Sequence, residues 1–170
     1  MNIIKDKDFE DFEFKGIQDV TDMTYKNFYN CKFTDCDFTN SDFSNSFFSE
    51  CVFSSTNCSL VKLSDTKMHD VYFNACKIMG VDFTQISKLI VELGFHESRI
   101  LKCNFSSIDL INTDFINCQI NQSDFYKTIL TESNFSGSDF KDTIFENTDL
   151  RKADFSNACQ LCCRNDSQIY

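Results

Sequence analysis

The sequence contains no proline, no tryptophan and only 4 glycines among its 170 residues. Proline and glycine mark turns and irregular loops in ordinary globular domains, so their scarcity indicates that few connections here are irregular. No apolar run approaches the roughly 18 residues that a membrane-spanning helix needs. The stretch from Met1 to Asp6 lacks the apolar segment of a secretory signal. We therefore expect a cytoplasmic protein without membrane contact, whose thiols stay reduced.

Positive charge is also in short supply, because 16 Lys and Arg face 26 Asp and Glu and give a formal net charge of −10. An acidic chain repels nucleic acids and anionic membranes, so we predict no direct binding of nucleic acid. Two interpretations of the charge stay open. It can serve solubility alone, or it can form a surface that imitates a polyanion.

What the chain has instead is phenylalanine, 20 residues of it, at a period of five. From residue 21 onward the third position of each five-residue unit, called position i, is apolar in every unit except the last, at Gln160. All phenylalanines follow this rule except Phe9, Phe12, Phe14 and Phe47. The predicted core ladder consists of Phe28, Phe33, Phe38, Phe43, Phe48, Phe53, Phe73, Phe83, Phe105, Phe115, Phe125, Phe135, Phe145 and Phe155.

A period of five fits neither an α-helix nor a β-strand, whose side chains repeat at 3.6 and 2 residues. It fits a chain that turns a right angle every five residues, so that four units complete one square turn. Position i then points to the axis, and position i−2 points into a corner with room for a small side chain. At i−2 a thiol is expected to act as a small buried hydrophobe, neither forming a disulfide nor binding a metal. Six of the cysteines occupy this position: Cys31, Cys36, Cys51, Cys76, Cys103 and Cys118.

The repeat divides the chain into segments. We predict an N-terminal cap over residues 1–20, in which Phe9, Phe12 and Phe14 fold over the first turn, and a coil over residues 21–162. The frame breaks near residues 84–88, between a first block at 21–85 and a second at 88–162. A two-residue bulge at Ile86 and Ser87 is favoured, and a short helix is the alternative. The tail at 163–170 is too short to cover the last turn, so the rod either ends open as a monomer or dimerises end to end.

The tandem pattern of a small residue, Asp or Asn, and Phe or Leu resembles the pentapeptide-repeat family over residues 21–162. This resemblance implies an all-β fold, a right-handed quadrilateral β-helix of about seven coils. The mixture of Cys and Phe in segments 30–38, 76–84 and 133–158 is similar to the Qnr/McbG group. Members of that group bind type II topoisomerases, chiefly DNA gyrase, and some protect the enzyme against quinolones or peptide toxins. Qnr-like proteins often project longer loops at the break, for which this chain has no room.

Function in such a rod is expected on its outward positions. Candidate acidic residues lie at i−1, which is Asp or Asn in many units: Asp22, Asp42, Asp82, Asp109, Asp114, Asp149 and Asp154. One interpretation is that each carboxylate bonds its own backbone and serves the turn. The other is that carboxylates along a rod of duplex-like width occupy a basic DNA-binding saddle, and the resemblance then implies DNA gyrase or topoisomerase IV as partner. A structural scaffold for some other protein is the alternative function.

No pattern in the sequence predicts catalysis or a cofactor. His69 and His96 lie at the outward position i+1, without partners at a catalytic or zinc-binding spacing. Cys159, Cys162 and Cys163 lack a second pair of metal ligands and are interpreted as a frayed end. We therefore predict that the protein is not an enzyme and needs neither cofactor nor metal.

Overall fold

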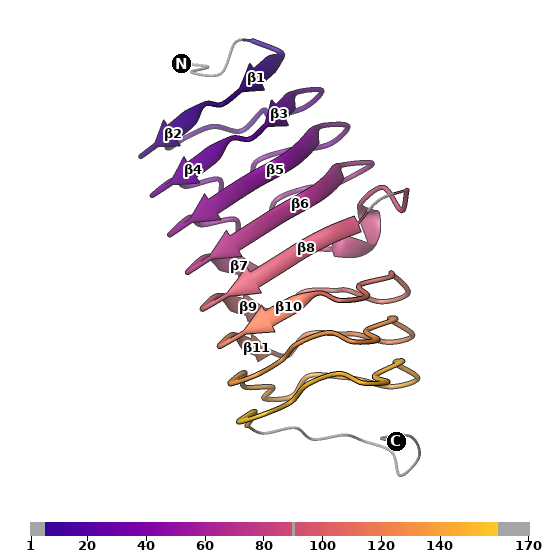
Figure 1. Ribbon diagram of the computed structural model, residues 1–170. Coiled ribbons are helices and arrows are strands. Elements are labelled where there is room, and N and C mark those ends of the chain that lie inside the picture. Colours follow the sequence, from indigo (N-terminus) through magenta and orange to yellow (C-terminus); the bar gives the residue numbers. More distant parts are fainter. Residues whose placement is uncertain (1–5, 90, 160–170) are drawn as a thin grey trace.

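The computed structural model describes residues 6–89 and 91–159, which wind into one elongated stack of coils (Figure 1). Every strand pairs in parallel with the strand one turn away. The protein is thus an all-β right-handed quadrilateral β-helix, as the resemblance implied, and none of its described residues forms an α-helix. The elements are β1 (Asp8–Glu10), β2 (Glu13–Lys15), β3 (Asn27–Tyr29), β4 (Lys32–Thr34), β5 (Phe47–Ser54), β6 (Lys67–Asn74), β7 (Lys77–Met79), the 3-10 helix η1 (Phe83–Gln85), β8 (Val91–His96), β9 (Arg99–Leu101), β10 (Asp114–Ile116) and β11 (Gln119–Asn121).

The turns are held together by main-chain hydrogen bonds between residues about twenty positions apart. Phe28 pairs with Phe48, and Phe33 pairs with Phe53. Followed along one face, the positions Asp22, Asp42, Lys62, Asp82, Asn104, Asp124 and Ile144 make about six turns. The sequence predicts about seven; its last unit includes residues 160–162, which lie outside the described part of the chain together with the predicted tail.

Phenylalanine rings stack along the axis from coil to coil. The rings of Phe33 and Phe53 are 4.6 Å apart at an interplanar angle of 11°, and those of Phe105 and Phe125 are 4.8 Å apart at 3°. Burying such a ring contributes about 1.5–3 kcal/mol, and a good aromatic pair adds about 0.5–1.5 kcal/mol. Twelve members of the core ladder are at most 3% exposed. Phe145 and Phe155, in the last described coils, are only partly buried.

The corners explain how the chain manages with few glycines. Position i+2 has a positive φ in nearly every unit, as in Asn30 (48°), Asp35 (55°) and Asn40 (61°). This left-handed conformation costs most L-residues roughly 1–2 kcal/mol, but Asn and Asp tolerate it well. The amide of the same residue donates to a carbonyl of the next coil, for example Asn30 N to Ser49 O at 2.9 Å. Sequence analysis did not single out this position, although Asn and Asp recur there.

Position i−2 holds small residues that are buried and hydrogen-bonded. The thiol of Cys118 donates to the carbonyls of Phe95 (3.2 Å) and Ile116 (3.4 Å), and the hydroxyl of Ser138 donates to Phe115 O at 2.6 Å. The six cysteines predicted at i−2 are all buried free thiols. Small polar side chains therefore close the corners because their one donor finds a carbonyl there.

The frame break lies in the predicted region, but its extra residues do not. Ser87 N donates to Thr66 O at 2.8 Å, and one turn earlier Lys67 N donates to Ser46 O. Donor and acceptor are 21 residues apart in both pairs, so the repeat is still regular at Ser87. Ile86 is 3% exposed and takes the corner position that Thr66 holds one turn earlier. The insertion therefore follows Ser87, where Leu89 is 83% exposed, and the register shifts between Met68 and Val71 on β6. The prediction that Ile86 and Ser87 are the extra residues is wrong, because the buried Ile86 side chain belongs to the repeat. The 3-10 helix η1, with N-cap Asp82, ends just before Ile86. The predicted inward position of Ile90 lies outside the described residues.

The segment predicted as an N-terminal cap lies over the first repeat coil as one further coil. β1 pairs with β3 and β2 with β4, so that the Phe9 ring stacks on Phe28 at 5.1 Å and the Phe14 ring on Phe33 at 4.9 Å. These pairs are 19 residues apart because the unit at residues 17–20 is one residue short. The alternatives of an open or a dimerising C-terminal end stay predictions.

Candidate protein-binding surfaces

The predicted aspartates lie on three faces of the rod, in columns parallel to its axis. Asp114, Asn134 and Asp154 follow one another on one face, in bridges one turn apart. Asp109 and Asp149 share a second face, but Ile129 lies between them. Asp22, Asp42 and Asp82 belong to a third face, which Lys62 interrupts. The seven residues are therefore brought into register, though not into an unbroken line of charge.

Most of these carboxylates also serve their own turn. Asp22 Oδ1 accepts from the amide and the hydroxyl of Thr24, at 2.9 and 2.7 Å. Asp82 and Thr84 repeat the arrangement at 3.1 and 2.6 Å. The hydrogen bonds from the Thr24 amide and hydroxyl lower the pKa of Asp22, and those from Ser156 lower the pKa of Asp154. The turn interpretation thus holds for one oxygen of the carboxyl group, while the charge is retained.

Basic residues neutralise part of the columns. Arg151 donates through Nε to Asp149 Oδ1 at 2.9 Å and through Nη2 to Asp149 Oδ2 at 2.6 Å. The hydrogen bonds from Arg151 hold the pKa of Asp149 at about 2. Lys62 Nζ lies 3.9 Å from Asp42 Oδ2. Asp149 and Asp42 therefore present less net charge to a partner than Asp114 and Asp154.

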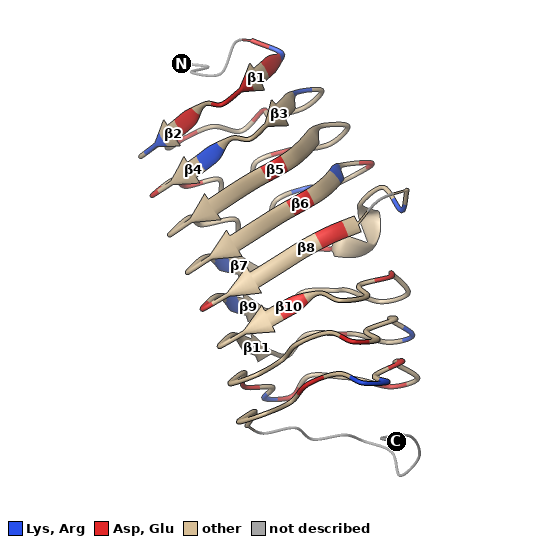
Figure 2. Ribbon diagram, in the orientation of Figure 1, with Lys and Arg blue, Asp and Glu red and all other residues tan. Residues whose placement is uncertain are grey.

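A further acidic feature was not predicted. Acidic residues gather at one corner of the rod, which we call the corner ridge: Asp11, Glu50, Asp70, Glu92 and Glu132. Figure 2 shows the members on β5, β6 and β8 following one another down the same side of the molecule. They fall at or next to i+2, a position that sequence analysis did not examine. A count of charges at i+2, made corner by corner, would have found the ridge.

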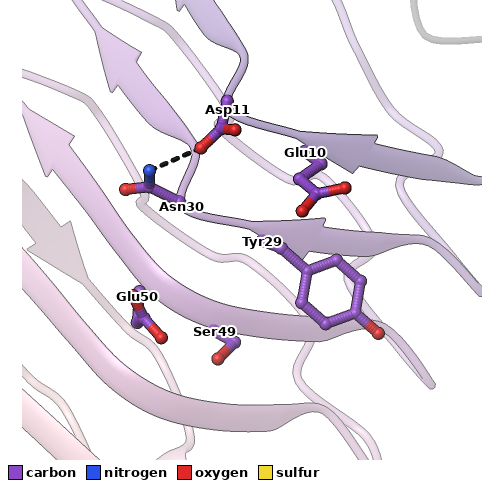
Figure 3. Close-up of a pocket in the computed structure, with 6 residues that line it drawn as sticks. All are labelled: Glu10, Asp11, Tyr29, Asn30, Ser49 and Glu50. Carbon is purple, nitrogen blue, oxygen red and sulfur yellow. Dashed lines mark hydrogen bonds between the residues drawn. The ribbon is translucent and has the colours of Figure 1, made fainter.

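An open hollow lies beside the N-terminal part of the corner ridge (Figure 3). It has a volume of about 500 Å³ and is lined by Glu10, Asp11, Tyr29, Asn30, Ser49 and Glu50. Asn30 Nδ2 donates to Asp11 Oδ1 at 2.6 Å, and the Tyr29 ring stands at the edge of the hollow. The lining thus combines three carboxylates with one aromatic face and no basic group.

The two histidines are less isolated than the sequence suggested. His69 Nε2 lies 3.1 Å from Glu92 Oε2, and His96 Nε2 lies 3.7 Å from Asp114 Oδ2. His69 Nδ1 also lies 3.3 Å from the Oγ atom of the buried Ser49, so the His69 ring stands between a hydroxyl and a carboxylate. Within residues 6–89 and 91–159, no three His, Cys, Asp or Glu side chains gather as metal ligands would. No helix in the same residues is long and apolar enough to cross a membrane. Cys159 is exposed, and Cys162 and Cys163 lie outside the described residues.

Comparison with known proteins places this rod in a family. The family described as "Pentapeptide repeat region" matches residues 26–89 and 88–155, so the chain belongs to the pentapeptide repeat family. Among solved structures, a trypsin-treated variant of QnrB1, a plasmid-mediated fluoroquinolone resistance protein, has a TM-score of 0.55 at 17% identity, covering 89% of this chain and 82% of that chain. HetL, a heterocyst differentiation regulator from the cyanobacterium Nostoc sp. strain PCC 7120, has a TM-score of 0.45 at 10% identity, covering 89% and 86%. No curated protein matches. At these identities the structural likeness shows the fold alone.

Proposed function

We propose that this protein is a non-enzymatic, cytoplasmic binding protein that engages a type II topoisomerase, DNA gyrase or topoisomerase IV, by presenting its acidic faces in place of duplex DNA. The observation that carries the proposal is the register of ionised carboxylates along the rod. Asp114 and Asp154 lie on one face, and in the described residues neither forms an ion pair with a Lys or Arg; His96 Nε2 lies 3.7 Å from Asp114 Oδ2. A positively charged DNA-binding saddle attracts regularly spaced anions, and complementary charge also speeds association.

The fold also supports this proposal. QnrB1, whose backbone is similar, is described as a plasmid-mediated fluoroquinolone resistance protein. The present chain has only a short insertion at its frame break, where Leu89 is exposed, and residues 6–89 and 91–159 contain no long loop. We therefore expect binding to the topoisomerase to be easier to detect than protection against a quinolone.

A DNA supercoiling assay tests the proposal directly. Purified gyrase is assayed with increasing amounts of the protein, with and without a quinolone, and the same series is run with topoisomerase IV. We expect inhibition of supercoiling, or relief of the quinolone effect, in proportion to the added protein. If neither enzyme binds the protein and neither activity changes, the proposed function is wrong.

Charge reversal assigns the effect to a face. The double substitution Asp114→Lys and Asp154→Lys should abolish the effect on the topoisomerase, because it replaces two anions on one column by cations. Asp35→Lys with Asp142→Lys makes the same change in charge at exposed corner positions away from that column. Equal loss in both variants would attribute the effect to net charge and not to the face.

A scaffold function is the second candidate, and one observation favours it. Carboxylates such as Asp22 and Asp82 are engaged by their own turns, and Asp149 is neutralised by Arg151. The columns are thus explained in part without a DNA-binding partner. If the protein binds a partner that is unaffected by reversal of Asp114 and Asp154, the scaffold function is favoured.

A further inference from the structure

One side of the rod carries aromatic side chains on an unpartnered sheet. β5 and β6 each run without interruption around the corner between two faces, and β8 continues the same surface. Tyr29 is 41% and Tyr72 36% exposed, and Phe47 is half-buried. The Tyr29 and Phe47 rings meet edge to face, with centroids 5.4 Å apart. Phe47 is thus not a member of the core ladder: its side chain lies on the outside of the rod and does not pack in the core.

The corner ridge runs between these aromatic groups. On β5, Glu50 lies between Phe47 and Val52, and on β6, Asp70 lies between His69 and Tyr72. Burial, followed by the nearby Asp70 carboxylate, raises the pKa of Tyr72. Neighbouring coils are about 4.8 Å apart, so the ridge offers about one carboxylate per coil over this part of the rod.

Charge on this side is compensated only in part. Lys152 Nζ pairs with Glu132 at 2.6 Å, but among the described residues the ridge members on β5 and β6 have no such cation. Glu92 has His69 at 3.1 Å and Asp11 has Asn30 at 2.6 Å. Neither Glu50 nor Asp70 lies within ion-pair distance of a Lys or Arg in the described part of the chain. Lys67 lies on β6, the strand that carries Asp70, and Lys32 lies on β4; both stand at i−1 positions.

The turn does not explain why glutamate stands on the ridge. Glu50 and Glu132 hold φ values of 55° and 62°, a conformation that favours Gly, Asn and Asp. Glutamate lacks the short side chain that lets Asn and Asp bond locally in this conformation. At the opposite corner the corresponding column reads Asn40, Leu60, Gly80, Lys102 and Gln122, without an acid until Asp142. The positive φ accounts for Asp11 and Asp70, but it does not account for the glutamates Glu50 and Glu132.

We propose that this aromatic and acidic side, over β3, β5, β6 and β8, binds an extended arginine-containing segment of a partner protein. Guanidinium groups pair with carboxylates through two parallel hydrogen bonds and also stack on aromatic rings. Glu50 supplies the first kind of contact and Tyr29 the second, and both line the same hollow. Asp70 and Tyr72 repeat the combination on the next strand, across the corner.

Charge and shape select this class of partner over others. Nucleic acid is repelled by the ridge, and a lysine ammonium ion lacks the planar fork that stacks on an aromatic ring. The surface spans two faces and several coils, so it suits a chain segment better than a small molecule. It uses none of the seven i−1 aspartates of the proposed topoisomerase site, and the proposal therefore goes beyond that function.

The test uses labelled peptides and the full-length protein. Fluorescence anisotropy is measured with the peptide Ser-Arg-Ser-Arg-Ser-Arg-Ser and with its lysine and glutamine counterparts. We expect saturable binding of the arginine peptide, about threefold weaker binding of the lysine peptide, and none of the glutamine peptide. The double substitution Glu50→Gln and Asp70→Asn should weaken binding about tenfold, because two charge-assisted pairs are lost. Tyr29→Ser should remove the preference for arginine over lysine.

Matched controls keep the proposal falsifiable. Asp65→Asn with Asp142→Asn removes two exposed charges from other corners of the rod and should leave binding unchanged. Circular dichroism and thermal unfolding confirm that each variant is folded, and Glu50→Gln alone serves if the double variant is not. Equal loss in control and test variants, equal affinity for arginine and lysine peptides, or no binding of the arginine peptide would each overturn the proposal. Since no topoisomerase is present, its failure is distinct from failure of the supercoiling assay.

Discussion

The ring of Tyr72 lies directly on the backbone of Gly94 in the next coil. A methyl group at position 94 would stand 2.5 Å from Cδ1 of Tyr72, well inside van der Waals contact. Gly94 has no positive φ, so the close approach of the ring, and not the backbone conformation, requires glycine here. An aromatic side chain thus covers a strand position that would otherwise expose its main chain.

The substitution Gly94→Ala should displace the Tyr72 ring and lower the free energy of unfolding by about 1 kcal/mol, the lower end of the cost of overpacking. Urea denaturation measures the change. In a Tyr72→Ala background the same substitution should cost little, because the obstructing ring is gone. An equal cost in both backgrounds would contradict the packing explanation.

Deletion of Lys88 and Leu89 should restore an uninterrupted repeat. Ser87 would then be followed by Ile90, Val91 and Glu92, and the next unit would begin at Leu93. Because Lys88 and Leu89 are exposed, we expect the shortened protein to unfold at an equal or higher urea concentration than the parent.

Deletion of Ile86 and Ser87 is the matched comparison, since it shortens the chain by the same length. It removes a side chain that is 3% exposed and brings Lys88 to the corner position. We expect a loss of roughly 2–4 kcal/mol in the free energy of unfolding. If the two deletions are equally tolerated, the insertion is not confined to the residues after Ser87.

The buried thiols should be unreactive and should make stability depend on pH. Burial raises the pKa of Cys51 and Cys118 to about 12, and that of Cys76 and Cys103 to about 11, from an ordinary value of 9.0. A group whose pKa is raised by folding favours the folded state below its unfolded pKa. The unfolded chain releases these protons first, so stability should fall as pH rises from about 9 towards 11 or 12.

Two measurements check the thiol prediction. After brief iodoacetamide treatment at pH 8, mass spectrometry should find Cys159 modified and the four buried cysteines intact, whereas denaturant should expose all of them. The urea midpoint should decrease between pH 9 and 10.5, and less steeply after Cys51→Ala with Cys118→Ala. Labelling of Cys51 at the rate of Cys159 in the folded protein would refute the prediction.

Arg151 should control the ionisation of Asp149. In Arg151→Gln, the pKa of Asp149 should rise from about 2 towards its ordinary value of 3.8, because the three charge-assisted hydrogen bonds from the guanidinium group are lost. NMR titration of the carboxyl group measures the shift, and Lys152→Gln, which affects Glu132 instead, is the control. A pKa that stays near 2 would contradict this pairing. Stability should change little, since the pair is exposed.

The interior of this protein could be predicted from the sequence because packing imposes one residue type every five positions. Phe28 and its equivalents have no alternative direction once the chain turns a right angle at each unit. The corner cysteines follow from the same geometry, because a larger side chain would not fit beside the rings. These parts depend on local spacing alone, which a single sequence displays.

The surface was less predictable because outward residues are chosen by several influences at once. The role of Asp82 as an N-cap and the pairing of Asp149 with Arg151 depend on contacts that the repeat does not specify. Glu50 and Asp70 were not predicted because the outward pattern of Asp and Asn was followed at i−1 only. The insertion was misplaced because Ile86 and Ile90 are both apolar, and only burial shows which residue the first block retains.

The four-sided coil also sets which changes in length the protein can accept. Inserting twenty residues would lengthen the rod by one coil and leave every side chain facing its original direction. Inserting five residues would leave position i pointing to the axis in every unit, but it would rotate all units after the insertion by a quarter turn. The packing of the hydrophobic core would be unchanged, yet the outward carboxylates of the second block would move to the neighbouring face of the rod. Duplication of a single five-residue unit can therefore change which faces of the two blocks lie on the same side of the rod, without any change in the packing of the core.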